Sequence, residues 1–302
     1  MSGTTEERRD AGVARVRREP PPSLSVPGSP KVRAQAFLTM VRKHLTEASR
    51  YPISFIATFG MIVLILGMFT LAALAFSDPS KEAELVPLKS VALYGFVIFM
   101  FTTSTLWEMG FSLRTEQVRG TLESLYLTPA SKVGNLVSRV FSLLVGTGIM
   151  VVLSIAVVKA SGSLIPIGDV WLGLLILLFT ITGLLGIGFM FAALTIVLKE
   201  SAQLAINGAQ FALLIICAMF FPFSALPAPL VDYVSRWVPL SYCVDAFRTV
   251  MSDYPAGYPE LAPLGVELAV VVGFGVLTPI IGYMIYRRVE RHARERGSLG
   301  EY

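Results

Sequence analysis

Six long apolar runs alternate with polar segments along the chain, and this alternation is its dominant pattern. The runs cover residues 53–76, 89–111, 135–158, 170–198, 204–223 and 264–286. Each run has about twenty residues or more, which is the length that a helix needs to cross a hydrocarbon core roughly 30 Å thick. The pattern therefore predicts an all-α integral membrane protein with six transmembrane helices.

Two different segments precede the first run. Residues 1–30 are rich in proline and charge and hold few apolar side chains, a composition typical of a disordered tail. In residues 31–50, five apolar side chains share one helical face: Ala34, Leu38, Val41, Leu45 and Ala48. This face predicts an interfacial helix in the membrane surface, with a helix packed on a soluble domain as the alternative. The predicted organisation is a tail (1–30), an interfacial helix (31–50), a six-span domain (51–286) and a basic tail (287–302).

The segment between the fifth and sixth runs is rich in proline, which argues against a further span. It contains two amphipathic pieces, residues 228–237 and 241–251. Each piece offers one candidate ion pair at helical spacing: Asp232 with Arg236, and Asp245 with Arg248. We interpret the segment as a re-entrant helical hairpin, which is tolerated where protein or water satisfies its backbone. The alternative is an ordinary external loop.

A short polar segment between the second and third runs has helical periodicity. Its apolar side chains recur at i, i+4 and i+7 with charged side chains opposite: Val118, Leu122 and Leu125 against Glu116, Arg119 and Glu123. Thr128 and Pro129 are typical of an N-cap and the first residue of the next helix. The segment is therefore predicted to form a short amphipathic helix outside the lipid, with one face available to another protein.

The distribution of basic residues predicts the orientation. Six spans place both termini and the polar segment after the second run on the same side of the membrane. Of the 25 lysine and arginine residues, 20 fall on that side. Because basic residues concentrate in cytoplasmic segments, both termini are assigned to the cytoplasm and the proline-rich hairpin to the outer face.

Composition agrees with a membrane protein and limits the chemistry of the chain. Hydrophobic residues make up 54% of the chain and charged residues 15%, against about 25% charged in an average soluble domain. The histidines, His44 and His292, lie far from any cluster of acids or cysteines, so neither a metal site nor a catalytic site is expected. Cys217 and Cys243 share no short spacing and are better explained as buried thiols than as a disulfide.

The chain also lacks the residues that would power transport unaided. It has no Gly-x-x-x-x-Gly-Lys-Ser/Thr loop for ATP phosphates. No charged residue or histidine falls near the middle of a run, which argues against a carrier driven by protons or ions. Basic termini without interleaved aromatics are typical of membrane anchors rather than of a nucleic-acid surface. Aromatic residues such as Phe96, Phe99 and Phe220 could line a route for an amphiphile, although packing is the commoner explanation.

Two segments carry a resemblance to a known family. The sequence Glu116-Gln-Val-Arg-Gly-Thr-Leu-Glu-Ser-Leu-Tyr-Leu-Thr-Pro129 resembles the signature of type-2 ABC exporter permeases, the membrane subunits of drug, lipid and polysaccharide exporters. The hairpin sequence Trp237-Val-Pro-Leu-Ser-Tyr-Cys-Val-Asp-Ala-Phe-Arg248 and the six-span layout are also similar to that family. The resemblance covers nearly everything after Lys31, and the long tail before it departs from the usual short N-terminus.

The resemblance implies a transporter with separate permease and ATPase subunits, a coupling segment and an outer gate. Two permease copies, here a homodimer, would pair with two copies of an ABC-type ATPase subunit that binds ATP and Mg²⁺, while this chain binds no cofactor. Coupling to the ATPase would rest on Glu116, Arg119, Gly120, Thr121, Leu122, Glu123, Thr128 and Pro129. The outer gate would include Pro239, Tyr242, Asp245 and Arg248.

We therefore expect a permease in the cell membrane of a prokaryote that moves a hydrophobic or amphiphilic compound, drug-like or lipid, out of the cytoplasm or inner leaflet. The alternatives are a polysaccharide or glycolipid exporter permease, a stand-alone carrier or channel, and a membrane scaffold that transports nothing. Aromatic side chains suit sugars and lipophilic compounds equally, and the weakly polar spans favour the lipophilic class.

Overall fold

The computed structural model describes residues 82–118, 132–160, 166–198 and 201–295, together with isolated positions between residues 38 and 67. Within these residues it consists of α-helices, 3-10 turns and loops without a β-strand, which confirms the predicted all-α class. The predicted tail of residues 1–30 lies outside the described residues, as do most of the interfacial helix and of the first span. The described positions 38, 39, 42 and 46 are helical.

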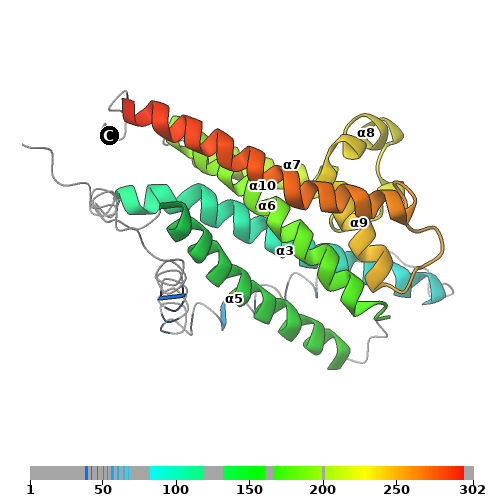
Figure 1. Cartoon of the computed structure of the whole chain (residues 1–302). Helices are drawn as coiled ribbons and strands as arrows, with labels where there is room; N and C mark the ends of the chain where they lie inside the picture. The colour runs from blue at the N-terminus through cyan, green and yellow to red at the C-terminus, as the bar shows by residue number, and fades with distance from the viewer. Residues whose placement is uncertain are drawn as a thin grey trace, which may run out of the picture.

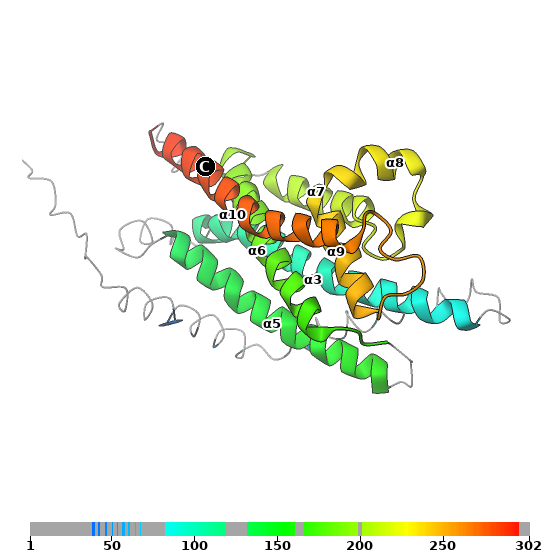
Figure 2. The same ribbon diagram turned by 45° about the vertical axis from the view of Figure 1, so that its right-hand side comes forward.

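Five helices form the body of the molecule. They are α3 (Glu82–Val118), α5 (Lys132–Ala160), α6 (Val170–Leu198), α7 (Ala202–Ile216) and α10 (Leu264–Glu295). Helix α3 contacts α5, α6 and α7, and α10 packs along α6. In Figures 1 and 2, α5 lies on the far side of α3 and α6 from α10, so α3 and α6 form the middle of the bundle.

Helices α6 and α10 pack closely because glycines face each other. A Cβ atom on Gly282 would lie 2.1 Å from the carbonyl oxygen of Gly186, and one on Gly186 would lie 2.2 Å from the carbonyl carbon of Thr278. Small residues let helix backbones approach in lipid, where van der Waals packing replaces the hydrophobic drive between helices. The distance between α6 and α10 is therefore set by contact between their backbones at these glycines.

Three helical segments in the described part of the chain are long and apolar enough to cross a membrane: Ser90–Gly110, Val170–Leu198 and Leu264–Ala293. They correspond to the predicted second, fourth and sixth spans. The predicted third span lies inside α5, where Leu144–Ala156 is a shorter apolar helix. The complete six-span topology stays a prediction.

Several predicted boundaries differ from the helix ends, and α3 extends beyond the predicted residues 89–111 in both directions. The sequence predicts helix to residue 223 in the fifth run, but α7 ends at Ile216 and turns follow, in which Ala218 has a φ of 47°. The residues of these turns, which include Cys217, Ala218 and Met219, are apolar and buried. The hydropathy of the sequence therefore does not mark the end of the helix. At the other end of the molecule, α10 continues beyond the predicted residue 286 to Glu295, since the arginine and glutamate residues that follow the apolar run are themselves good helix formers.

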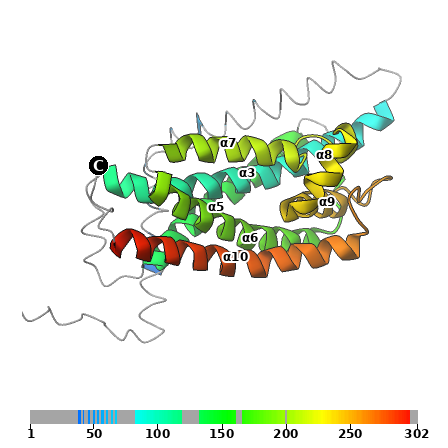
Figure 3. The same cartoon turned by 90° about the horizontal axis from the view of Figure 1, so that it is seen from above.

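Short helices fill the segment between α7 and α10, which we call the hairpin (residues 217–263). They are η3 (Phe223–Ala225), α8 (Ala228–Tyr233), η4 (Ser235–Trp237) and α9 (Pro239–Met251). Helix α9 packs against α3, α6 and α10, and α8 and α9 gather at one end of the bundle (Figures 1 and 3). The two predicted amphipathic pieces are thus present, as α8 with η4 and as α9, whereas re-entry into the membrane stays a prediction.

Candidate functional site

The predicted coupling segment lies almost wholly outside the described residues. Glu116 is in the last turn of α3, which continues without interruption from the apolar segment to Val118. The other seven predicted residues are not described: Arg119, Gly120, Thr121, Leu122, Glu123, Thr128 and Pro129. Their role stays a prediction, and the site that the structure does describe is in the hairpin.

Arg248 of α9 is wholly buried and binds the turn that follows α7. Its Nη2 donates to the carbonyl oxygen of Ala218 at 2.6 Å, and its Nη1 donates to that of Phe221 at 3.1 Å. Helix α3 leaves room for the guanidinium at Gly95, where a Cβ atom would lie 2.3 Å from Nη2. Irregular backbone at membrane depth needs hydrogen bonds from protein, because lipid supplies none. Arg248 supplies two of them from one rigid group.

The charge of Arg248 is retained despite this burial. Burial lowers the pKa of Arg248 to about 10, and the neighbouring Tyr258, Asp245 and Glu260 raise it. The guanidinium is therefore charged at neutral pH. A buried charge is costly unless it is paired and hydrogen-bonded, and here two carbonyl groups bind it while nearby carboxylates balance it.

The predicted ion pair between Asp245 and Arg248 is wrong in its partners. Asp245 is wholly buried, and its Oδ2 accepts hydrogen bonds from the backbone N–H groups of Glu260 and Leu261, each at 2.8 Å. Arg248 instead binds the turn after α7. The three-residue spacing places both side chains on α9, but each one satisfies a different stretch of irregular backbone.

Two further acids complete this polar network, and neither of them is among the site residues predicted from the sequence. Glu260 accepts hydrogen bonds from the backbone N–H groups of Phe223 and Ser224. Glu267 lies in the first turn of α10, is wholly buried and accepts a hydrogen bond from the N–H of Ala262 at 3.3 Å. An acid inside an apolar run is a functional candidate by itself, so a signal for Glu267 was present. Glu260 lies in a loop, where an acidic residue is common and gives no sequence signal of a functional role.

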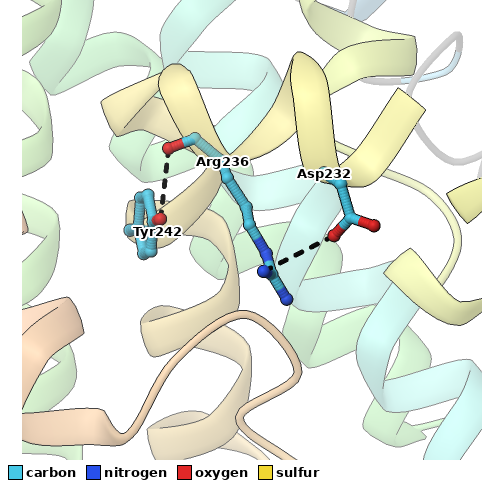
Figure 4. A network of polar contacts seen from close by, with 3 residues as sticks. All are labelled: Asp232, Arg236 and Tyr242. Atoms are coloured by element: carbon cyan, nitrogen blue, oxygen red, sulfur yellow. Dashed lines mark hydrogen bonds and ion pairs between the residues drawn. The ribbon is translucent and has the colours of Figure 1, made fainter. Parts of the chain in front are cut away.

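Pro239 and Tyr242 lie outside the buried network. Pro239 is the first residue of α9, and the Tyr242 hydroxyl donates to the carbonyl oxygen of Arg236 at 3.1 Å (Figure 4). The predicted ion pair between Asp232 and Arg236 is present at 3.4 Å, with both side chains about half exposed. An exposed pair contributes little to stability. Of the four predicted gate residues, Asp245 and Arg248 thus belong to the buried network, and Pro239 and Tyr242 do not.

Several other sequence predictions are also tested by the described residues. Cys217 and Cys243 are free and buried, as expected. Phe96, Phe99 and Phe220 pack against one another, with ring centroids 5.0 to 6.3 Å apart. The three rings thus pack on one another, and a role in lining a route for an amphiphile stays a prediction. Among the described residues no group of three or more histidine, cysteine or acidic side chains is arranged to hold a metal ion.

A second polar group lies where α3 meets α7. Trp107 is 41% exposed, and its indole N–H donates to Oε1 of Gln210 at 2.7 Å. On the same helix, Ser104 is hydrogen-bonded to Thr147 of α5 at 3.1 Å. An exposed indole ring next to an amide offers both an apolar and a polar contact.

The described helices, three of which contain segments long and apolar enough to cross a membrane, indicate an α-helical membrane protein. Residues 35–252 match the model of the ABC-2 type transporter family, and because this match covers most of the chain, the protein belongs to that family. The comparison with curated proteins gave no match. The resemblance noted in the sequence is therefore confirmed at the level of the family. The match ends one residue after α9, so Glu267 and the rest of α10 lie beyond it.

Proposed function

We propose that the chain is the permease subunit of an ABC exporter and that the hairpin is its outer gate. The observation that carries this proposal is the buried network of Arg248, Asp245 and Glu260, which builds a short-helix segment into one end of the bundle. A closure held by a few discrete hydrogen bonds can exist in two arrangements, as a gate requires. The family membership supplies the transport function, and the gate and the direction of transport are our proposal.

We propose an amphiphilic substrate, drug-like or lipid. The exposed Trp107 ring beside Gln210 supports this class, because it combines an apolar surface with a hydrogen-bonding amide. A polysaccharide or glycolipid is the second candidate, since an exposed indole ring also stacks on sugars.

The substrate proposal is tested by transport assays in vesicles that contain the permease and its ATPase. Labelled lipid, a lipophilic dye and an oligosaccharide are offered separately, with and without ATP. We expect ATP-dependent movement of the first two and a several-fold loss with Trp107→Ala. Trp171→Ala is the matched control, because Trp171 is 83% exposed at the start of α6, away from Gln210. Movement of the oligosaccharide alone favours the second candidate, and flux without ATP indicates a carrier or channel.

We propose further that two copies of the chain pair with two ATPase subunits in a prokaryotic cell membrane, with both termini in the cytoplasm. The absence of a phosphate-binding loop from the sequence supports a separate ATPase. The segment from Glu116 to Pro129 would be its contact, because a docked amphipathic helix can transmit ATPase closure to the spans that it joins.

The coupling proposal is tested with Gly120→Trp and Glu123→Arg. We expect both variants to assemble in the membrane but to lose substrate-stimulated ATP hydrolysis, because bulk or a reversed charge would disrupt the docked helix. Glu295→Arg is the matched control, since it reverses an exposed acid at the end of α10. If all three variants keep wild-type stimulation, the coupling assignment is wrong.

A further inference from the structure

Two carboxyl groups hold three consecutive backbone amides in the loop before α10. The N–H groups of Glu260 and Leu261 donate to Oδ2 of Asp245, and the N–H of Ala262 donates to Oε1 of Glu267. Because three consecutive amides of this loop bind the two carboxyl groups, Asp245 of α9 and Glu267 of α10 are brought side by side. Both side chains are 0% exposed.

The remaining oxygen of each carboxyl group has no hydrogen-bond donor. Oδ1 of Asp245 and Oε2 of Glu267 are both buried without a partner, although the two side chains are within hydrogen-bonding contact of each other. Two ionised carboxylates in contact without a donor would repel strongly in a buried site. One proton between them removes the repulsion and turns the contact into a charge-assisted hydrogen bond.

We propose that Asp245 and Glu267 share one proton, which makes this carboxyl pair a proton-binding site that latches the hairpin to α10. The O–H of one carboxyl group donates to the carboxylate oxygen of the other. Loss of the proton leaves two adjacent carboxylates, which separate α9 and the loop from the start of α10. The latch is therefore closed at lower pH and opens as the pH rises.

Among the described residues no hydrogen bond connects a donor to these two oxygens, and Nε of Arg248, on the same helix as Asp245, is also buried without a partner. The ionisable groups nearby are Cys243 and Arg248 on α9, Tyr258 and Glu260 in the loop, Cys217 in the turn after α7 and Tyr94 on α3. Arg248 directs its Nη atoms to backbone carbonyl groups, and the Tyr94 hydroxyl donates to the carbonyl oxygen of Pro166. Helix α6, which packs on both α9 and α10, contains no ionisable residue.

The proton is tested directly by infrared spectroscopy of the full-length protein in lipid nanodiscs. We expect a carbonyl stretch of a protonated carboxylic acid at about pH 7, where exposed carboxyl groups are ionised. The band should shift in D₂O and be lost in Glu267→Gln, whose amide can donate to Asp245 and so keep the hairpin folded. Glu295→Gln, at the exposed end of the same helix, should keep the band. A band that is absent from the wild type, or unchanged in Glu267→Gln, overturns the proposal.

The latch is tested by hydrogen exchange of the peptide that contains residues 260–262. After correction for intrinsic exchange chemistry, we expect its protection in the wild type to fall by roughly tenfold or more between about pH 6 and about pH 9. Protection in Glu267→Gln should not depend on pH. A pH-independent wild type contradicts the latch, and protection that follows sodium concentration at fixed pH instead indicates a bound cation and also contradicts it. Neither measurement uses transport, so failure of the latch is distinguishable from failure of the proposed gate. Only the effect of the latch on export rests on the proposed function.

Discussion

Arg248 connects α9 to the turn that follows α7 through two hydrogen bonds. A lysine would keep the positive charge but has a single nitrogen, which cannot reproduce the fork that binds the carbonyl oxygens of Ala218 and Phe221. A buried acceptor left without a donor costs about 1–3 kcal/mol. We expect Arg248→Lys to lower the free energy of unfolding by about that amount, measured by thermal or denaturant unfolding of the purified protein in detergent.

The matched control for this prediction is Arg236→Lys on the same hairpin. Arg236 is half exposed, and its ion pair with Asp232 is open to solvent. A surface change of this kind usually alters stability by less than about 0.5 kcal/mol. Equal losses in the two variants would show that the buried carbonyl groups are not what Arg248 stabilises.

At the same scale, Asp245 and Arg248 show what the sequence can predict about a site. Both are buried and hydrogen-bonded, as charged residues on an amphipathic helix between spans need to be, whereas their role in a gate stays a prediction. Their pairing with each other was wrong, because helical spacing reports only neighbours along α9. The true acceptors and donors are backbone groups of residues 218, 221, 260 and 261, and backbone groups carry no sequence signal.

At the scale of helices, the contact between α6 and α10 gives a sharp test. Gly282→Ala would place a methyl group 2.1 Å from the carbonyl oxygen of Gly186. Because this neighbour is backbone, the helices must separate, and overpacking of this kind costs about 1–3 kcal/mol. Gly273→Ala changes the same residue type in the same helix, where no atom lies within 4 Å of the new Cβ atom. We expect thermal unfolding to show a loss of stability for Gly282→Ala only, and the glycine contact is unimportant if the two variants agree.

The ends of helices α6 and α7 show why helix boundaries are harder to predict from the sequence than the helices themselves. The fourth run was predicted from residue 170 to 198, and α6 has those bounds because polar or charged residues flank an unbroken apolar stretch. The end of α7 was missed because the turn after Ile216 is as apolar as the helix, and its carbonyl groups are bound by Arg248, thirty residues further along the chain. The composition of the sequence around a helix end does not show a hydrogen-bond partner that comes from a distant part of the chain.

For the whole molecule, the family and the all-helical class could be predicted from the sequence, whereas the arrangement of the helices could not. Apolar length and the basic residues predict how many spans there are and which side they face. Which helix packs on which depends on small residues such as Gly186 and Gly282, which the apolar pattern does not distinguish from other glycines. The hairpin network is likewise a product of contacts among α3, α7, α9 and α10.

The orientation of the bundle in the membrane follows from the positions of its two ends and of its basic residues. The hairpin and the C-terminal part of α10 lie at opposite ends of the bundle (Figures 1 and 3), and 20 of the 25 basic residues belong to the predicted cytoplasmic side. We expect the hairpin to face outward and residue 292 to face the cytoplasm. The measurement uses Ala256→Cys and His292→Cys, both at exposed positions, in a background where Cys217 and Cys243 are replaced by alanine.

A membrane-impermeant maleimide should label Ala256→Cys in intact right-side-out vesicles, and it should label His292→Cys only after the vesicles are permeabilised. The opposite pattern would reverse the orientation, which would place the carboxyl pair and its proton on the cytoplasmic side. Labelling of both positions in intact vesicles would show that α10 does not cross the membrane, and the hairpin would then not be an outer gate. The accessibility of these two positions therefore decides whether the pH of the outside medium or of the cytoplasm acts on the pair formed by Asp245 and Glu267.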